Sequence, residues 1–372
     1  MKKILIIGAG ISGLYLANLL EKSGKYDYKI LEKKTDLNLN EGYGIQLSVN
    51  GVKLLNRIGF RQLALSEINY PKKINFCDVK NNRLITSIEI SKFNNNENFY
   101  TTIKRSVLLK LLIKNIPKEK IVLGSNIKSI EQNSNFKINF INDSFEEASY
   151  LAICDGVFSK SKNMVLGNVD NVKYYKAVAI RGMIKNQENN DISLYLGPNF
   201  HFVIYSINQR NESNFISIIR EKNLEKIQNG NKNSLTSEYL DKITKNSSFN
   251  LKDKLEQIYL YPIFVSKKLI KPQNKRIFFG GDALYTYPPS FAQGASQSIE
   301  SSYDIFKSLE GDNINYYHER EIKINQVKLR SQFNHYAFHI SNPFFKLARN
   351  IALKYLTKND KFLESYLGKI YR

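Results

Sequence analysis

Residues 3–33 read "KILIIGAGISGLYLANLLEKSGKYDYKILEK" and contain the pattern that decides the fold. The run "KILII" is typical of a buried strand, and the apolar residues of "SGLYLANLLEKSG" recur at helical spacing before a second strand, "DYKILEK". Between the first strand and the helix, Gly8, Gly10 and Gly13 form the pattern GxGxxG. Glu32 ends the second strand, nineteen residues after Gly13. This order of elements predicts a β-α-β unit that binds a dinucleotide.

Each residue of this unit has a physical reason for its position. Gly8 allows the tight turn, Gly10 lets backbone amides approach a pyrophosphate, and Gly13 lets the helix pack closely on the strand. Ser12 lies in the first helical turn, whose free N–H groups would face the phosphates. Glu32 would accept hydrogen bonds from a ribose. A β-α-β unit without a ligand is the alternative interpretation.

The composition is that of a globular protein in a reducing, cytoplasmic setting. The chain has 372 residues, enough for roughly two domains, and 42% of them are hydrophobic. Cys77 and Cys154 cannot build a disulfide framework, and the four scattered histidines suggest no metal site. The N-terminus could pass for a signal peptide, but its glycines and Asn18 interrupt the apolar run and no cleavage site follows. No apolar run is long enough for a membrane span.

The net charge of +21 has several explanations. Lysines lie along the whole chain, often beside asparagine, and no arginine-rich block or RNA-binding motif is present. We therefore attribute the charge to compositional bias and expect no nucleic-acid partner. An anionic small-molecule substrate and a weak membrane-surface contact are the alternatives. The basic, amphipathic C-terminus "FFKLARNIALKYLTKNDKFLESYLGKIYR" would favour the membrane.

A second stretch, "IFFGGDALYTYPPSFAQGASQSIE" at residues 277–300, has the form of a strand, a stiff loop and a helix start. Asp282 follows the buried strand, two prolines stiffen the loop, and Gln293 and Gly294 begin the helix. A helix N-terminus stabilises negative charge. We expect this stretch to act together with the N-terminal glycine turn.

Five motifs in order resemble the single-component flavoprotein aromatic hydroxylases, in particular the salicylate hydroxylase-like and 3-hydroxybenzoate 6-hydroxylase-like branch. The resemblance covers the chain to about residue 355. Its motifs are "GAGISGL", "GYGIQLSVNGVKLLNRIGF", "KRSVLLKLL", "CDGVFSKSK" and "GGDALYTYPPSFAQGASQSIE". Tyr285, in place of the family's histidine, and Lys162, in place of its arginine, depart from the pattern.

The resemblance implies an α/β fold. A discontinuous Rossmann-like FAD-binding domain would be joined by a strand-rich α+β substrate domain and C-terminal helices. We expect FAD-binding segments at 1–70, 103–170 and 273–310, substrate-domain segments at 71–102 and 171–272, and C-terminal helices over 311–372.

The resemblance also implies which further residues contact FAD. Asp282 would bind the ribityl hydroxyls, and the start of the following helix would face the pyrimidine edge of the flavin. The other residues that match the family's FAD-contacting positions are Gly44, Ile45, Arg105, Asp155, Gly281, Pro289, Gln293, Gly294 and Ala295.

By the same resemblance, NADH or NADPH reduces the FAD, O2 adds to give a C4a-hydroperoxide, and a small aromatic substrate is hydroxylated. His201 and Tyr205, four residues apart on a predicted strand, share one face. The resemblance makes His201 a proton acceptor or hydrogen-bond partner of the substrate, and Tyr205 a hydrogen-bond donor to it. A solvated His201 with a core Tyr205 is the alternative. His335 and His339, lacking a third ligand nearby, are expected to pack.

Other functions remain open from the sequence. The chain could be a related flavoprotein that acts on a quinone precursor, a polyene or another metabolite. It could also be a non-catalytic FAD-binding protein. A monomer and a homodimer are both compatible with the sequence.

Overall fold

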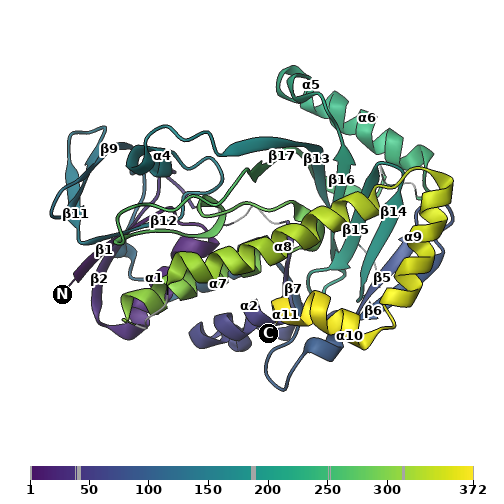
Figure 1. Ribbon diagram of the computed structural model, residues 1–372, viewed down its shortest axis with the longest axis horizontal. Coiled ribbons are helices and arrows are strands. Elements are labelled where there is room, and N and C mark those ends of the chain that lie inside the picture. Colours follow the sequence, from purple (N-terminus) through teal and green to yellow (C-terminus); the bar gives the residue numbers. More distant parts are fainter. Residues whose placement is uncertain are drawn as a thin grey trace.

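The computed structural model describes residues 2–37, 39, 43–185, 190–249, 251, 253–311 and 315–371. Figure 1 shows a parallel sheet at one end of the molecule, a larger sheet at the other, and the long helix α8 (Tyr316–Phe338) running between them. The predicted α/β class, with a Rossmann-like part and a second strand-rich part, is confirmed.

The parallel sheet gathers strands from distant parts of the chain. Its order is β18-β12-β1-β2-β8, and every neighbouring pair is parallel. Helices α1 (Ile11–Ser23) and α7 (Gly294–Leu309) pack together beside it. The central strands β1 and β12 are largely apolar because both faces of the sheet are covered there, whereas β2 also carries Asp27 and Lys29. The bounds of the sheet's strands are Lys2–Ile7 (β1), Tyr26–Leu31 (β2), Ile121–Val122 (β8), Tyr150–Ile153 (β12) and Ile277–Phe279 (β18).

Two small antiparallel sheets flank the parallel one. The first contains β9 (Ile127–Gln132), β10 (Phe136–Phe140) and β11 (Phe145–Ala148). The second has the order β3-β7-β4, with bounds Gly44–Leu47, Thr101–Lys104 and Ile68–Asn69. Three helices belong to the same half of the molecule: α2 (Val49–Leu55), α3 (Arg105–Lys114) and α4 (Lys160–Leu166).

The large sheet has seven strands in the order β17-β13-β16-β15-β14-β5-β6. One face packs on α5 (Leu224–Asn229) and α6 (Lys232–Lys245), and the other faces the C-terminal helices. The strand bounds are Lys73–Asp78 (β5), Leu84–Glu89 (β6), Val172–Lys185 (β13), Ile192–Gly197 (β14), Phe200–Ser206 (β15), Glu212–Arg220 (β16) and Leu255–Ser266 (β17).

The sequence predicts that the polar stretch after residue 221 is helical to about residue 258, and the strand β17 corrects this prediction. The helix α6 ends at Lys245, and β17 begins at Leu255. β17 pairs only with β13 and is an edge strand, where Pro262 is tolerated because one side makes no ladder hydrogen bonds. Its aromatic and β-branched residues favour the strand.

Helices predominate among the described residues between 294 and 371, and the sequence predicts C-terminal helices over 311–372. After α8 come α9 (Pro343–Leu356), α10 (Asp360–Leu363) and α11 (Lys369–Tyr371). Buried Arg320 joins α8 to α7 through ion pairs with Glu300 (3.3 Å) and Asp304 (3.1 Å). Within the described residues, no helix combines the length and the apolar character needed to cross a lipid bilayer.

Candidate functional site

Four neighbouring parallel strands end at the same edge of their sheet, and each is followed by a residue singled out from the sequence. Gly8 follows β1, Glu32 follows β2, Asp155 comes two residues after β12, and Asp282 comes three residues after β18. Ligands bind at this edge in open α/β sheets. The fold therefore brings together three carboxylates and a glycine turn that are spread over 275 residues of sequence.

The glycine turn leaves space on one side only. Gly8 has a φ of 102°, and a Cβ there would lie 2.6 Å from the Cys154 carbonyl oxygen. A Cβ on Gly13 would lie 2.0 Å from the Gly8 carbonyl oxygen, so only glycine lets α1 pack here. A Cβ on Gly10, in contrast, would meet nothing within 4 Å. Gly10 therefore borders open space at the start of α1.

The hydroxyl of Ser12 points away from that space. It lies 2.7 Å from the Ser302 Oγ and 3.4 Å from the Cys154 Sγ, between α1, α7 and β12. Only the backbone N–H of Ser12 is left for a ligand. The α1 N-terminus has no side-chain cap and no acidic residue in its first turn, so its first N–H groups have no acceptor from the helix itself.

Glu32 is held at the edge by backbone groups. Its carboxylate accepts hydrogen bonds from the backbone N–H of Ala9 (2.9 Å) and of Lys34 (3.0 Å). The side chain is half-buried, and its remaining lone pairs are available to a hydroxyl donor. Glu32 is thus held beside the glycine turn by these two backbone hydrogen bonds.

Asp155 has one carboxylate oxygen with a partner and one without. Its Oδ2 accepts a hydrogen bond from the backbone N–H of Ser161 (3.3 Å), while its Oδ1 is buried and makes no hydrogen bond in the described part of the chain. A buried acceptor without a partner is costly, which indicates a group that is absent from the protein alone. Nearby Lys162 is buried and donates to the Ala283 carbonyl (2.8 Å).

Asp282 lies in a tight turn that exposes its side chain. Gly281 takes a φ of 58°, and its N–H donates to the Ser301 Oγ (3.0 Å). The Asp282 side chain reaches solvent, although the protein around it is dense. Desolvation raises the pKa of Asp282 to about 6, and the positive charge of Arg181 partly offsets this rise. Hydrogen-bond donors brought by a ligand would stabilise the ionised form of this acid, which the free protein disfavours.

The start of α7 borders Asp282. The N-cap Gln293 provides no side-chain cap, and a Cβ on Gly294 would meet nothing within 4 Å. The Gln293 amide instead donates to the Ser48 Oγ (3.1 Å), which ties α7 to the segment before α2. Ala295 is half-buried in the same first turn. Asp282 and Gly294 line one small cavity, together with Gly281, Leu284, Tyr285, Tyr287, Gln297, Ser298 and Arg320.

The segment around β3 contains two further predicted residues and lies against the large sheet. Gly44 donates its N–H to the Asn214 Oδ1 (2.7 Å), and a Cβ at Gly44 would lie 2.5 Å from the Ile207 side chain. Only glycine therefore lets β3 lie against the large sheet. Ile45, half-buried, pairs with Ile103 across β3 and β7. Arg105 opens α3, and its N–H donates to the Tyr43 carbonyl (3.0 Å).

Arg181 connects the two sheets electrostatically. It projects from β13, and its guanidinium lies 4.1 Å from the centroid of the Tyr43 ring. Its charge opposes the burial-driven rise in the pKa of both Tyr205 and Asp282, so it lies close to both. In the sequence, Arg181 interrupts the apolar run "AVAIRGMI". The family resemblance implies an arginine near the substrate-domain sheet at this position, and a structural ion pair is at least as good an interpretation of the sequence.

Tyr205 and His201 share one face of β15, as their spacing predicts. Tyr205 and the residues around His201 contact the same hydrophobic cluster under α8, which contains Leu196, Phe291 and Phe338. Burial raises the pKa of Tyr205, and the nearby Gln46 side chain, which accepts a hydrogen bond from Tyr100 (2.8 Å), partly offsets this rise. Tyr205 is therefore joined to the β3 segment and to Arg181.

His201 belongs to a cluster of three buried histidines. Its Nδ1 lies 2.8 Å from the His339 Nε2, and the rings of His335 and His339 lie 4.1 Å apart. Burial, and then the charge of His335, lowers the pKa of His201 to about 3. The sequence showed His335 and His339 one helical turn apart but no third histidine near them. In the structure, His201 of β15 lies beside them. No group of His, Cys, Asp or Glu in the described ranges is arranged to hold a metal.

The loop before α7 touches this cluster. Pro289 is half-buried, and the next residue, Ser290, lies with its Oγ 3.4 Å from the His335 Nδ1. Asn334 also donates to the Ser290 carbonyl (3.1 Å). The proline loop is therefore held against α8, with the start of α7 on one side and the histidine cluster on the other.

Comparison with known proteins links these features to flavoproteins. A family model described as "FAD binding domain" matches residues 1–311. The FAD-dependent monooxygenase dpchE of Colletotrichum higginsianum is 25% identical over 175 residues, which is 43% of this chain and 35% of that protein. This chain thus spans about a third of the length of that curated relative.

Two solved structures have the same fold. Klebsiella pneumoniae HpxO, complexed with FAD and uric acid, superposes with a TM-score of 0.84 at 16% identity, covering 99% of this chain and 96% of that one. Salicylate hydroxylase in a substrate complex gives a TM-score of 0.74 at 17% identity, covering 100% and 98%.

Proposed function

Since this chain belongs to the FAD-binding domain family, we propose that it is an FAD-dependent monooxygenase. It would take electrons from NADH or NADPH and insert one oxygen atom of O2 into a small aromatic, phenolic acid-like substrate. The name of the curated relative and the substrate complexes of the two structural neighbours support this assignment.

The residues at the sheet edge fit FAD. Glu32 would bind the adenosine ribose, the α1 N-terminus with Gly10 the pyrophosphate, and Asp282 the ribityl hydroxyls. The α7 N-terminus at Gly294 would face the flavin. Three acids lie beside two helix N-termini that have no side-chain cap. One of these acids, Asp155, has a buried Oδ1 that makes no hydrogen bond within the described residues. This arrangement is the observation that carries the proposal. Acids and helix N-termini together offer acceptors for hydroxyls and donors for phosphates.

When bound, the flavin supplies hydride acceptance and the activation of O2. The protein must then hold the substrate, keep water out and favour its ionised form. The cluster under α8 supplies an apolar wall next to Tyr205, which suits an aromatic ring. Tyr205 would donate a hydrogen bond from its hydroxyl to a substrate oxygen, because burial keeps that hydroxyl protonated.

Arg181 would favour loss of the phenolic proton. A guanidinium near Tyr205 stabilises a phenolate oxygen and so lowers the pKa of a bound phenol. A phenolate is the more electron-rich ring and the better acceptor of the transferred oxygen. This gives Arg181 part of the role that the sequence resemblance suggested for His201.

His201 would act as a neutral hydrogen-bond partner. A pKa of about 3 makes it a weak base at physiological pH, so its imidazole stays uncharged. Its Nδ1 faces His339, which leaves Nε2 for a substrate group. The His339 contact would fix the orientation of the ring.

The test is to purify the chain, measure bound FAD by absorbance, and follow NADH and NADPH oxidation with a panel of phenolic acids. We expect flavin-bound protein whose reductant oxidation rises with at least one phenolic acid and yields a hydroxylated product. Protein that binds flavin but never oxidises either reductant would contradict the proposal and favour a non-catalytic role.

A further inference from the structure

One face of α9 is apolar and open to solvent. Five large side chains on this helix are 58–73% exposed: Phe344, Phe345, Leu347, Ile351 and Tyr355. On a helix, positions 344, 351 and 355 fall on one side, with 347 and 345 on its flanks. Few soluble monomers expose so many large apolar side chains on one helix, so this face calls for a partner.

The opposite face of α9 fixes the helix to the protein. Leu353 packs on the hydrophobic cluster that contains Tyr205, and Arg349 is buried and donates to the Ala337 carbonyl (3.4 Å). Just after the helix, the hydroxyls of Thr357 and Thr86 lie 2.7 Å apart. Figure 1 shows α9 at one end of the molecule, beside β6. Contacts on the inner side therefore hold α9 in place, and the outer face is left open to solvent.

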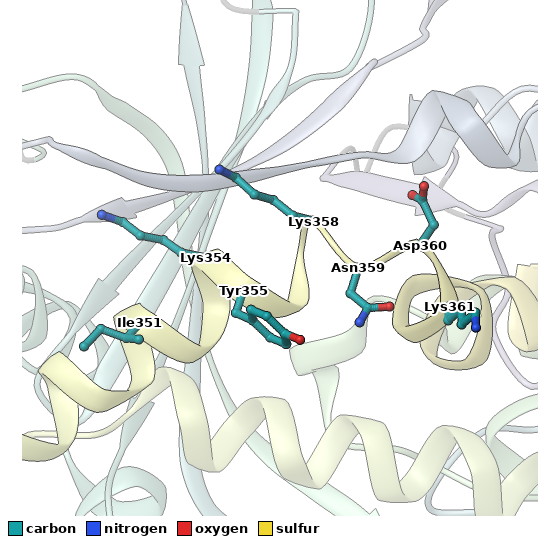
Figure 2. Close-up of a pocket in the computed structure, with 7 residues that line it drawn as sticks. All are labelled: Ile351, Lys354, Tyr355, Lys358, Asn359, Asp360 and Lys361. Carbon is teal, nitrogen blue, oxygen red and sulfur yellow. The ribbon is translucent and has the colours of Figure 1, made fainter.

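Positive charges predominate around this face, and the nearby acid Asp360 pairs with Lys92 (3.1 Å). Residues 322–359 contain seven Lys or Arg residues and no Asp or Glu. Lys354, Lys358 and Lys361 line a groove at the end of α9, together with Ile351, Tyr355, Asn359 and Asp360. Figure 2 shows Lys354 and Lys358 extending to one side of the helix while Tyr355 points to the other.

We propose that the outer face of α9 docks on an anionic phospholipid surface. Apolar side chains on one side of a helix, flanked by lysines, match the interface of lipid tails and acidic headgroups. A second copy of this chain is a poorer occupant, because a two-fold contact would bring the same basic segments together. This inference does not depend on the proposed reaction.

The experiment is co-sedimentation of the full chain with vesicles of phosphatidylcholine alone and of phosphatidylcholine mixed with phosphatidylglycerol. We expect binding to the mixed vesicles, weakened by salt, and little binding to the neutral ones. Ile351→Glu should lower binding by at least roughly tenfold, since it removes one large apolar side chain and adds a negative charge. Lys354→Gln with Lys358→Gln should lower it by roughly 25-fold, because each basic residue near an anionic surface contributes about fivefold.

Matched controls come from elsewhere on the surface. Ile141→Glu alters an isoleucine that is 67% exposed on the β10–β11 turn, and Lys110→Gln with Lys114→Gln removes two exposed lysines from α3, which packs on α1 in the other half of the molecule. Neither control should change vesicle binding, and every variant should keep the wild-type circular dichroism spectrum.

Three results would overturn the proposal. The first is a wild-type protein that stays in the supernatant with anionic vesicles, or binds neutral ones equally well. The second is an Ile351→Glu variant that binds as the wild type does, or a control that loses binding as Ile351→Glu does. The third is a wild-type dimer in sedimentation velocity that Ile351→Glu converts to a monomer without any vesicle binding, which would assign the face to a second copy.

Discussion

Replacing Asp282 with asparagine should weaken FAD binding and, at the same time, stabilise the FAD-free protein. Desolvation raises the pKa of this carboxyl from 3.8 to about 6, so the free protein at pH 7 carries a charge that its surroundings disfavour. A shift of this size corresponds to about 3 kcal/mol for an enclosed group. Because the side chain reaches solvent, we expect no more than about 1 kcal/mol of stabilisation in Asp282→Asn.

The sign follows from proton linkage. A carboxyl whose pKa is raised by folding disfavours the folded state above that pKa, and this penalty fades as pH falls through about 6 toward 3.8. The stability gain of FAD-free Asp282→Asn should therefore be present at pH 7 and vanish near pH 4. Thermal unfolding of the FAD-free proteins across pH measures it.

FAD affinity should change in the opposite direction. Hydrogen bonds to a charged acceptor contribute roughly 1.5–3 kcal/mol, against about 1 kcal/mol for a neutral one. We expect Asp282→Asn to bind FAD roughly tenfold more weakly at pH 7. In the wild type, affinity should fall below about pH 6, approaching tenfold per pH unit, because the protonated carboxyl accepts hydrogen bonds poorly. In Asp282→Asn this fall in FAD affinity at low pH should be absent.

Fluorescence titration of the FAD-free proteins across pH is the assay, with Asp170→Asn as the control. Asp170 is an exposed aspartate that pairs with Lys267, and its replacement should alter neither FAD affinity nor its pH dependence. Equal FAD affinity in the wild type and Asp282→Asn at pH 7, or the same pH step in both, would refute the placement of the ribityl chain at Asp282.

Further substitutions test other parts of the account. Gly294→Val should leave the protein folded but bind FAD poorly or reduce it slowly, because the new side chain enters the open space at the start of α7; wild-type reduction kinetics would refute this. Tyr205→Phe and His201→Ala should keep FAD yet release more hydrogen peroxide per reductant consumed, because each removes a hydrogen bond that holds the substrate. Tight coupling in both would remove them from the site. Arg320→Ala should cost about 3 kcal/mol of unfolding free energy, since it removes the buried partner of two α7 carboxylates and leaves them the more exposed Lys323 and Lys307. A loss below 1 kcal/mol in chemical denaturation would contradict that reasoning.

The parts of the fold that the sequence predicted well depend on short-range patterns. The glycine turn, the helix that follows it and Glu32 lie within one β-α-β unit, where spacing alone constrains the geometry. The β17 strand escaped detection because polar residues and Pro262 interrupt its apolar pattern, and pairing with β13 stabilises it. That pairing is a long-range contact, which local propensity does not encode.

The candidate site likewise contains features that the local sequence predicts and features that depend on long-range contacts. Asp282 could be placed at the end of a strand from the local sequence, but its raised pKa depends on burial by distant segments and on Arg181 from another sheet. The hydrogen bond between His201 and His339 joins residues 138 positions apart. The sequence showed both histidines but could not show that they meet, since their contact is set by how α8 crosses the large sheet.

The most direct test of the account follows the oxygen atom. The FAD-loaded protein would be given NADH or NADPH and a phenolic acid that accelerates their oxidation, under an atmosphere of ¹⁸O2, and the product would be analysed by mass spectrometry. A monooxygenase predicts one ¹⁸O atom in each molecule of hydroxylated product. Product oxygen that comes from water, or reductant oxidation that yields only hydrogen peroxide with every phenolic acid, would contradict it.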